Sequence, residues 1–195
     1  MDLSSFFKAE FAEHQDVARR SAAVLDSAFA ELVAACVASV RSGGKILFFG
    51  NGGSAADAQH LATELTVRYK RDRAAIAALA LTTDTSALTA AGNDLGFEHV
   101  FARQVAALGR AGDVAIGIST SGKSRNVLMA LRQARSQKLV TAALTGNDGG
   151  DLRDLADHLL IVPSHTTSRI QEMHILLGQM LCGALEIELG LSQAD

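Results

Sequence analysis

A chain of 195 residues, 48% of them hydrophobic and 20% charged, is long enough to bury one sizeable core, which excludes a disordered protein. Its net charge of −3 argues against a general nucleic-acid surface, which usually carries a basic excess, but does not exclude a local site for one phosphate. The sequence contains no run of about 18 apolar residues, so we expect no membrane-spanning helix.

The compartment is indicated by the N-terminus and by the cysteines. The start, MDLSSFFKAEFAEHQD, lacks the basic beginning and apolar centre of a signal peptide. Cys36 and Cys182 are best interpreted as buried free thiols, with a disulfide as the less favoured alternative. We therefore expect a cytoplasmic protein.

Residues 1–42 are predicted to be helical because apolar side chains recur there at helical spacing, with a break near Asp26 and Ser27. The stretch RSGG ends this region, since glycine terminates helices. We expect one domain over residues 1–195. In it, residues 1–42 form a helical oligomerisation segment, and residues 43–195 form an α/β core with a C-terminal helix.

An alternation of apolar runs and helical patterns follows. The runs are KILFF (45–49), IAALAL (76–81), DVAIGI (113–118), LVTAAL (139–144) and HLLIV (158–162). The helical patterns span 54–68, 84–91, 97–108, 124–137 and, briefly, 150–156. Continuous apolar strands that alternate with helices predict an α/β fold with a parallel sheet covered on both faces.

The last predicted helix, residues 168–189, is apolar on nearly every side, so it needs burial on more than one face. Packing against another subunit is the preferred interpretation, and cover by the N-terminal helices of the same chain is the alternative. Several polar residues interrupt this helix, and on a buried helix such groups are either hydrogen-bonded or functional. A hydrogen-bond network at an interface is the structural explanation. These polar residues are Arg169, Gln171, Glu172, His174 and Gln179.

Three of the predicted strands end in polar, glycine-containing loops, at residues 50–54, 119–124 and 145–150. Ligands of open α/β sheets bind at the carboxyl ends of the strands. The second loop carries Ser119, Thr120, Ser121 and Ser124 just before a predicted helix. Hydroxyls and free N–H groups at a helix N-terminus suit a phosphate. Simple capping by Ser124 is the alternative, but capping needs only one hydroxyl.

The first loop, GNGGSA, also matches the dinucleotide pattern G-x-G-x-x-A, which is a weak signal when it stands alone. The acid that would bind a ribose should follow about 20 residues later. That region is predicted to be helix, and the first acid after the next strand is Asp84. Two polar loops of this kind therefore suit a small sugar phosphate better than a dinucleotide.

His60 and Glu64 lie at positions i and i+4, so they share one helix face. This spacing suits two metal ligands, or a base and its orienting partner, but it is also common in surface ion pairs. Asn93 and Asp94 suit either a turn or contacts to sugar hydroxyls. Arg68, Arg71 and Arg73 are interpreted as a solvated basic stretch.

Taken together, these segments resemble the sugar isomerase (SIS) domain family, and within it the phosphoheptose isomerases. The segments that carry the resemblance are FGNGGSAADAQH, ELTVRY, ALTTDTSALTAAGND, ARQVAALGRAGDVAIGISTSGKSRNVL, ALTGNDGG, VPS and RIQEMH. The resemblance implies a three-layer αβα sandwich with a five-stranded parallel sheet, and a homotetramer with active sites between subunits. The implied reaction interconverts sedoheptulose 7-phosphate and D-glycero-D-manno-heptose 7-phosphate, for the heptose of lipopolysaccharide.

The resemblance also implies roles for individual residues. Glu64 matches the proton-transferring base, and His60, Glu64 and Gln171 match the ligands of one zinc ion per subunit. The residues that match substrate contacts are Asn51, Gly52, Gly53, Ser54, Glu64, Asn93, Asp94, Ser119, Thr120, Ser121, Ser124 and Gln171.

One position departs from the family pattern. The family places a histidine, as both zinc ligand and general acid, eight residues after the glutamine of RIQE, and here that position is Gln179. An amide cannot titrate near neutral pH and binds zinc weakly. The chain is then an isomerase with a modified site, an inactivated variant, or a non-catalytic binding protein like the DnaA initiator-associating proteins. Because Glu64 and the Gly-Gly-Ser loop are present, the sequence favours the isomerase.

Overall fold

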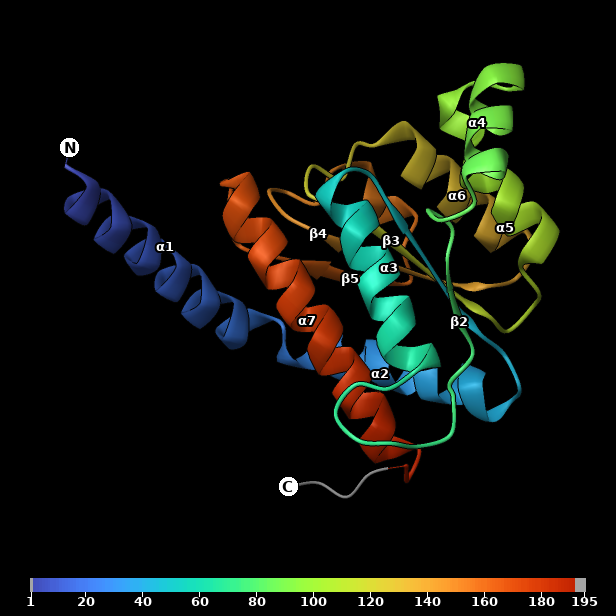
Figure 1. Ribbon diagram of the computed structural model, residues 1–195, viewed down its shortest axis with the longest axis horizontal. Helices are drawn as coiled ribbons and strands as arrows, with labels where there is room; N and C mark the ends of the chain where they lie inside the picture. The colour runs from blue at the N-terminus through green and yellow to red at the C-terminus, as the bar shows by residue number, and fades with distance from the viewer. Residues whose placement is uncertain (1, 192–195) are drawn as a thin grey trace.

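Five strands form one all-parallel sheet in the computed structural model, which describes residues 2–191 (Figure 1). The strands, in chain order, are β1 (Ile46–Gly50), β2 (Ala78–Ala80), β3 (Val114–Ser119), β4 (Val140–Thr145) and β5 (His158–Ile161). Their order across the sheet is β2-β1-β3-β4-β5, which places the ends of β1 and β3 next to each other. Strands β1 and β3 are buried along their whole length, as expected for a parallel sheet covered on both faces.

Helices cover both faces of this sheet. They are α1 (Leu3–Val24), α2 (Asp26–Arg41), α3 (Gly53–Thr66), α4 (Thr85–Asp94), α5 (Ala102–Leu108), α6 (Arg125–Ser136) and α7 (Thr167–Glu188). Helices α2, α3 and α7 pack on one face, whereas α4, α5 and α6 pack on the other. The three-layer α/β sandwich is therefore confirmed.

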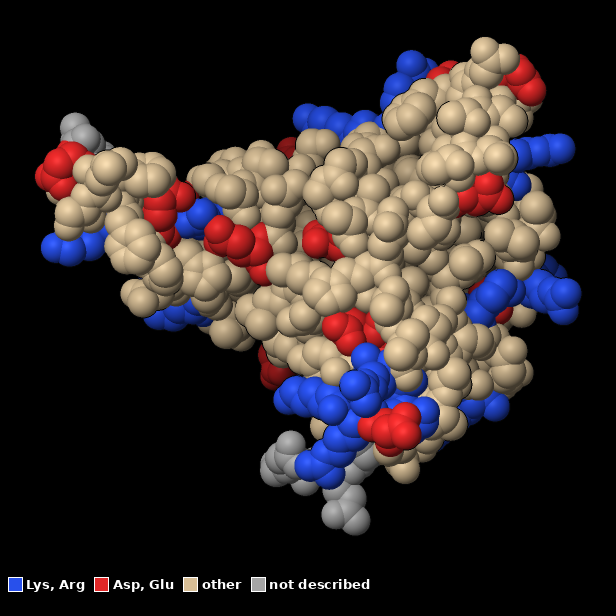
Figure 2. Space-filling view, in the orientation of Figure 1, with Lys and Arg blue, Asp and Glu red and all other residues tan. Residues whose placement is uncertain are grey.

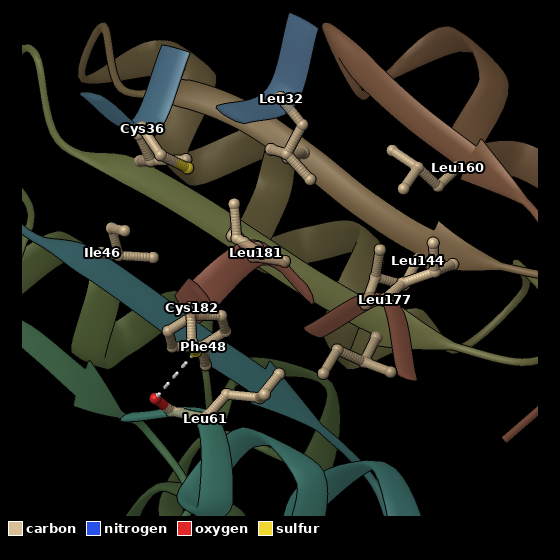
Figure 3. Close-up of a cluster of buried hydrophobic side chains, with 14 of the residues drawn as sticks. Leu32, Cys36, Ile46, Phe48, Leu61, Leu144, Leu160, Leu177, Leu181 and Cys182 are labelled. Carbon is tan, nitrogen blue, oxygen red and sulfur yellow. Dashed lines mark hydrogen bonds between the residues drawn. The ribbon is translucent and has the colours of Figure 1, made fainter. Parts of the chain in front are cut away.

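The two cores follow from the alternation of side chains along each strand. In β1, Ile46 and Phe48 join the core under α2, α3 and α7, while Leu47 and Phe49 join the core under α4, α5 and α6. Figure 3 shows the first of these cores, where the Cys182 thiol of α7 donates to the carbonyl of Leu61 in α3 at 3.9 Å. Burial on both faces is what fixes the strand between two helical layers.

Some predicted boundaries differ from the structure. The run 76–81 yields only the short strand β2, and the helix predicted at 84–91 continues to Asp94. The pattern at 97–108 splits into a 3₁₀ turn, Phe97–His99, and the short helix α5. Gly96 precedes this turn with φ 97°, a conformation that favours glycine and separates the turn from α4. The short pattern at 150–156 is also a 3₁₀ turn, Gly150–Asp154.

The N-terminal helices meet at Leu25, next to the predicted break, and are bent by 68° there. Helix α2 lies under the sheet, whereas α1 extends away from the body of the molecule (Figure 1). Within residues 2–191, no single helix is long and apolar enough to cross a membrane, and the bent α1–α2 pair meets that test only by length and composition.

Candidate active site

The loop after β1 is a tight turn that begins α3 at the carboxyl edge of the sheet. A side chain at Gly50 would place its Cβ 2.7 Å from the carbonyl oxygen of Ile118, so only glycine fits there. Gly52 adopts φ 56° as the residue before α3, and the amide of Ser54 donates to the carbonyl of Asn51 at 3.0 Å. The amide of Ala55 likewise donates to the carbonyl of Gly52 at 3.0 Å, so this turn is closed by its own hydrogen bonds and places the beginning of α3 at this edge.

Asn51 joins this loop to α6 through a pair of reciprocal amide hydrogen bonds. Its Nδ2 donates to Oδ1 of Asn126 at 2.9 Å, and Nδ2 of Asn126 donates to Oδ1 of Asn51 at 2.8 Å. Asn126 is 3% exposed. Sequence reasoning missed Asn126, because it is the second residue of α6, where a polar side chain is ordinary.

Residues 119–124, called the hydroxyl loop below, follow β3 and lead into α6. The Ser119 hydroxyl donates to the Ser124 hydroxyl at 3.0 Å, and Oγ of Ser121 accepts from the amide of Lys123 at 3.2 Å. Ser124 occupies the residue before α6 but makes no side-chain capping hydrogen bond. Simple capping, the alternative considered from the sequence, is therefore not what the Ser124 hydroxyl does.

His60 and Glu64 lie together on the outer side of α3. His60 Nε2 is 2.9 Å from Glu64 Oε1, and their side chains are 48% and 17% exposed. The pKa of Asp57, one turn before His60, is raised by partial burial, and a charge on His60 opposes this shift. The pair is therefore an oriented carboxylate, accessible from solvent, in the second half of α3.

Helix α7 runs beside α3 in the same direction (Figure 1). Gln171 Nε2 lies 2.9 Å from where a Cβ of Gly53 would be, and a Cβ of Gly178 would lie 2.4 Å from Leu61 Cδ1. Burial, and then the charge of Glu64, raise the pKa of the Cys182 thiol to about 12. Gln171 of α7 thus lies next to the beginning of α3. Gln179 follows Gly178, so it lies on the part of α7 that runs beside Leu61, between His60 and Glu64.

The residues expected to bind zinc offer few strong donors. His60 supplies one imidazole and Glu64 one carboxylate, whereas Gln171 and Gln179 supply only amides. Within residues 2–191, no group of three or more His, Cys, Asp or Glu side chains could hold a metal ion. Catalytic zinc sites use three protein ligands of the imidazole, thiolate or carboxylate type, so these residues do not make a complete zinc site.

Asn93 and Asp94 lie apart from the loops described above. They form the end of α4, where Asn93 Nδ2 donates to Asp94 Oδ1 at 2.8 Å, so they are helical rather than a turn. Asp94 faces a cavity of about 680 Å³ between α4 and α5, together with Asp84 and Arg103. The described lining of this cavity includes no other predicted site residue.

Arg73 is buried, and its interpretation as part of a solvated stretch is wrong. Its side chain is 1% exposed and pairs with Glu186 of α7, Nε to Oε1, at 2.8 Å. The same guanidinium donates to the carbonyls of Glu64 and Leu65, at 2.6 and 2.7 Å, in the last turn of α3. This contact, which holds the end of α3 against α7, is called the Arg73 clamp below.

His174 lies in the buried interior of the molecule. It is fully buried, whereas Gln179 is only half-buried. Neither ring nitrogen has a hydrogen-bond partner among the described residues. Burial lowers the pKa of His174 to about 4, and the nearby Thr145 carbonyl opposes that shift only in part. His174 therefore does not replace a missing histidine at position 179.

Comparison with known proteins gives one consistent family. A family model described as "SIS domain" matches residues 11–146. The phosphoheptose isomerase of Paramagnetospirillum magneticum is 59% identical over 186 residues, which cover 95% of this chain and 97% of that protein. The phosphoheptose isomerase of Campylobacter jejuni is 54% identical, over 94% of this chain and 98% of that protein.

Solved structures agree. The structure of phosphoheptose isomerase GmhA from Neisseria gonorrhoeae matches with a TM-score of 0.90 and 47% identity, over 95% of this chain and 99% of that one. A phosphoheptose isomerase from Francisella tularensis matches with a TM-score of 0.92 and 37% identity, over 95% and 98%. The chain, with its five-stranded parallel sheet and two polar loops, therefore belongs to the SIS-domain family and, within it, to the phosphoheptose isomerases.

Proposed function

We propose that the protein is a sedoheptulose 7-phosphate isomerase that forms D-glycero-D-manno-heptose 7-phosphate for lipopolysaccharide precursors in the cytoplasm. The observation that carries the proposal is an oriented, accessible Glu64 carboxylate on the helix that begins beside the hydroxyl loop. The names of the relatives, which are phosphoheptose isomerases at 50–59% identity, support the same reaction.

The proposed reaction moves one proton between two neighbouring carbons. Glu64 removes a proton from C1 of the ketose, and the electron pair forms the C1–C2 double bond of an enediol. As the double bond forms, the carbonyl electron pair moves to O2, which takes a proton from solvent water and completes the enediol. Glu64 then returns the carbon-bound proton to C2, while O1 loses its hydroxyl proton to water and becomes the aldehyde oxygen. His60 holds the carboxylate in place through its Nε2. Gln179 occupies the position of the family's proton-carrying histidine but can only offer hydrogen bonds to the substrate oxygens.

We assign the phosphate to the hydroxyl loop and the sugar to the residues around it. Ser119 and Ser124 already lie in hydrogen-bond contact, and the N-terminus of α6 follows directly, so hydroxyls and helix N–H groups converge. The proposed sugar contacts are Asn51, Gly52, Gly53, Ser54, Glu64 and Gln171, and the other proposed phosphate contacts are Thr120 and Ser121. All of them lie on two neighbouring strand ends or on the adjoining helices α3 and α7.

Zinc is proposed as a weakly held cofactor of His60, Glu64, Gln171 and Gln179. Bound there, it would polarise the substrate oxygens. Because only one imidazole and one carboxylate are strong donors, we expect occupancy well below one ion per chain.

We further propose that the chain forms a homotetramer through its helical segment, residues 1–42, and α7. Phe6, Phe7 and Phe11 on α1 are all more than half exposed. Figure 2 shows that the middle of the face over α3 and α7 is mainly uncharged, with Lys and Arg gathered at its lower end. An apolar groove of about 250 Å³ lies between α1, α2 and α7. In such an assembly, Asn93 and Asp94 would contact the sugar bound by a neighbouring subunit.

The test is turnover of sedoheptulose 7-phosphate by the purified chain, with zinc added and with zinc removed. Formation of the aldose phosphate that Glu64→Gln abolishes is the expected result. Absence of turnover by both the wild-type chain and Gln179→His would contradict the proposal. The DnaA-binding alternative is not favoured, because the relatives are named as isomerases.

A further inference from the structure

Asn147 has an unusual backbone conformation in the loop after β4. Its φ is 55°, in the left-handed region, and among the described residues only Lys138 shares this feature without being glycine. Asparagine tolerates that conformation better than most side chains, but it still costs more there than glycine would. A non-glycine residue at such a strained position indicates that its side chain makes contacts that offset the strain.

The side chain and backbone of Asn147 connect three separate segments. Its Nδ2 donates to the carbonyl of Thr120 in the hydroxyl loop at 3.0 Å. Its backbone amide donates to the carbonyl of Ser164 at 3.0 Å, and its Oδ1 lies 3.0 Å from Nδ1 of His165. The amide of Gly146 adds a second donor to the Thr120 carbonyl, at 3.2 Å. Asn147 is therefore fixed at both ends of its side-chain amide.

The hydroxyl loop lies directly on the loop that carries Asn147. A Cβ at Gly122 would come within 2.2 Å of the carbonyl oxygen of Gly149, and one at Gly150 would come within 2.8 Å of the carbonyl oxygen of Ser121. No side chain fits between these two loops at either point. The position of one loop therefore sets the position of the other.

We infer that Asn147 is a positioning residue for phosphate binding: through the Thr120 carbonyl it holds the N–H groups and hydroxyls of the hydroxyl loop in their binding orientation. The inference rests on the proposed function, in which this loop takes the phosphate. A loop that is already ordered does not lose conformational freedom on binding, so its affinity is higher than that of a loose loop. Asn147 contacts Thr120 and not the phosphate, so its effect is on affinity rather than on the proton transfer.

Two variants separate the side chain from the backbone. Asn147→Gly keeps the left-handed conformation without strain but removes the side-chain hydrogen bonds. Asn147→Asp keeps the shape and replaces the Nδ2 donor with an oxygen that cannot donate to the Thr120 carbonyl. Lys138→Gly is the matched control, because Lys138 has φ 63° but precedes β4, at the opposite edge of the sheet.

Binding of inorganic phosphate is measured by calorimetry, alongside KM and kcat for sedoheptulose 7-phosphate. Both Asn147 variants should weaken phosphate binding and raise KM by about 2- to 12-fold, the loss of one ordinary hydrogen bond. We expect kcat to change by less than about twofold, because the proton transfer is untouched. Lys138→Gly should leave all three values unchanged.

Amide hydrogen exchange of the peptide covering residues 119–124 gives a readout that needs no ligand. Exchange there should be faster in Asn147→Gly, with segments that do not contact residue 147, such as α2 and α5, unchanged. Unchanged exchange and unchanged phosphate affinity in both variants would overturn the inference and leave the proposed function intact. A wild-type chain that neither binds phosphate nor converts the substrate would overturn both.

Discussion

The Glu64 side chain combines orientation with access. His60 holds one carboxylate oxygen at 2.9 Å, and the side chain is still 17% exposed. A buried carboxylate would need compensation for its lost hydration, whereas a fully exposed one would be free to rotate. This intermediate placement suits a base that must meet a carbon-bound proton in one geometry.

Glu64→Gln should therefore remove the base while keeping the shape and the contact to His60. We expect kcat to fall by about 10²- to 10⁴-fold, with little change in thermal stability. Steady-state turnover of sedoheptulose 7-phosphate, with a melting curve for each protein, checks this. Glu31→Gln, at an exposed site on α2, is the control and should keep wild-type activity.

Gln179→His should complete the donor set on α7 with a second imidazole. Because imidazole binds zinc far better than an amide does, metal content after dialysis should rise towards one ion per chain, and turnover should rise with it. Elemental analysis of both proteins, prepared in parallel, measures the first effect without any assay of activity. Equal zinc content in the two proteins would show that position 179 does not face the His60–Glu64 pair.

His174 should make stability depend on pH. Its pKa is about 4 in the fold and about 6.5 in the unfolded chain, so the unfolded chain binds more protons between these values. The free energy of unfolding that comes from burying a neutral His174 is fully present above pH 6.5. It is lost as pH falls towards 4, by up to about 1.4 kcal/mol per pH unit. Urea denaturation of wild type and His174→Leu at pH 5 and pH 7 should show a shallower dependence in the variant. An equal change in unfolding free energy between pH 5 and pH 7 in the two proteins would contradict a lowered pKa of His174.

Some residues of the site could be read from the sequence, and others could not. The polar loops were predictable because glycine and hydroxyl residues follow apolar runs, and such loops sit where parallel strands end. Asn126 and Asn147 were missed because their roles arise from contacts with residues 75 and 27 positions away. Arg73 was misread because an arginine near other basic residues resembles a solvated stretch until its buried partner, Glu186, is known.

Among the elements, helices α3 and α7 act as one unit. They touch closely at Leu61 and Gly178 and are joined at their far ends by the Arg73 clamp. The sequence predicted both helices, because their apolar patterns are long and continuous. Their parallel contact depends on a glycine at position 178, whose importance cannot be seen without the neighbouring helix.

Glu186→Ala should leave the Arg73 guanidinium buried without its carboxylate. Breaking a buried pair in this way costs about 3–5 kcal/mol of unfolding free energy, and turnover should fall as the end of α3 loosens near Glu64. Chemical denaturation measures the loss. The double variant Arg73→Met with Glu186→Leu removes both charges and should recover much of the stability. Asp16→Ala, at an exposed pair with Arg19, should cost measurably less.

At the scale of the whole molecule, the arrangement of α1 and α7 suggests a surface meant for another copy of the chain. Leu176, Met180 and Ile187 on α7 are each 45% exposed, in a helix whose other side is buried in the core. The alternative that the chain's own N-terminal helices cover α7 holds only in part, because α1 extends away from the body (Figure 1).

Replacing Phe6, Phe7 and Phe11 together with serine should weaken the proposed tetramer. Each buried aromatic side chain in an interface contributes about 1.5–3 kcal/mol, so three losses should shift the assembly to smaller species at micromolar concentration. Light scattering coupled to gel filtration gives the mass. Lys8→Ser on the same helix is the control. A triple variant with wild-type mass would contradict an interface at α1.

Much of the proposed phosphate site is main chain, and this has a consequence for how the protein can change. The N–H groups at the beginning of α6 belong to the main chain and exist whatever side chains follow them. No single side-chain replacement can remove these main-chain hydrogen bonds to an anion. Residues lining the sugar can then vary, one at a time, towards other phosphorylated sugars while the anchor persists. The fold therefore separates holding the substrate from choosing it.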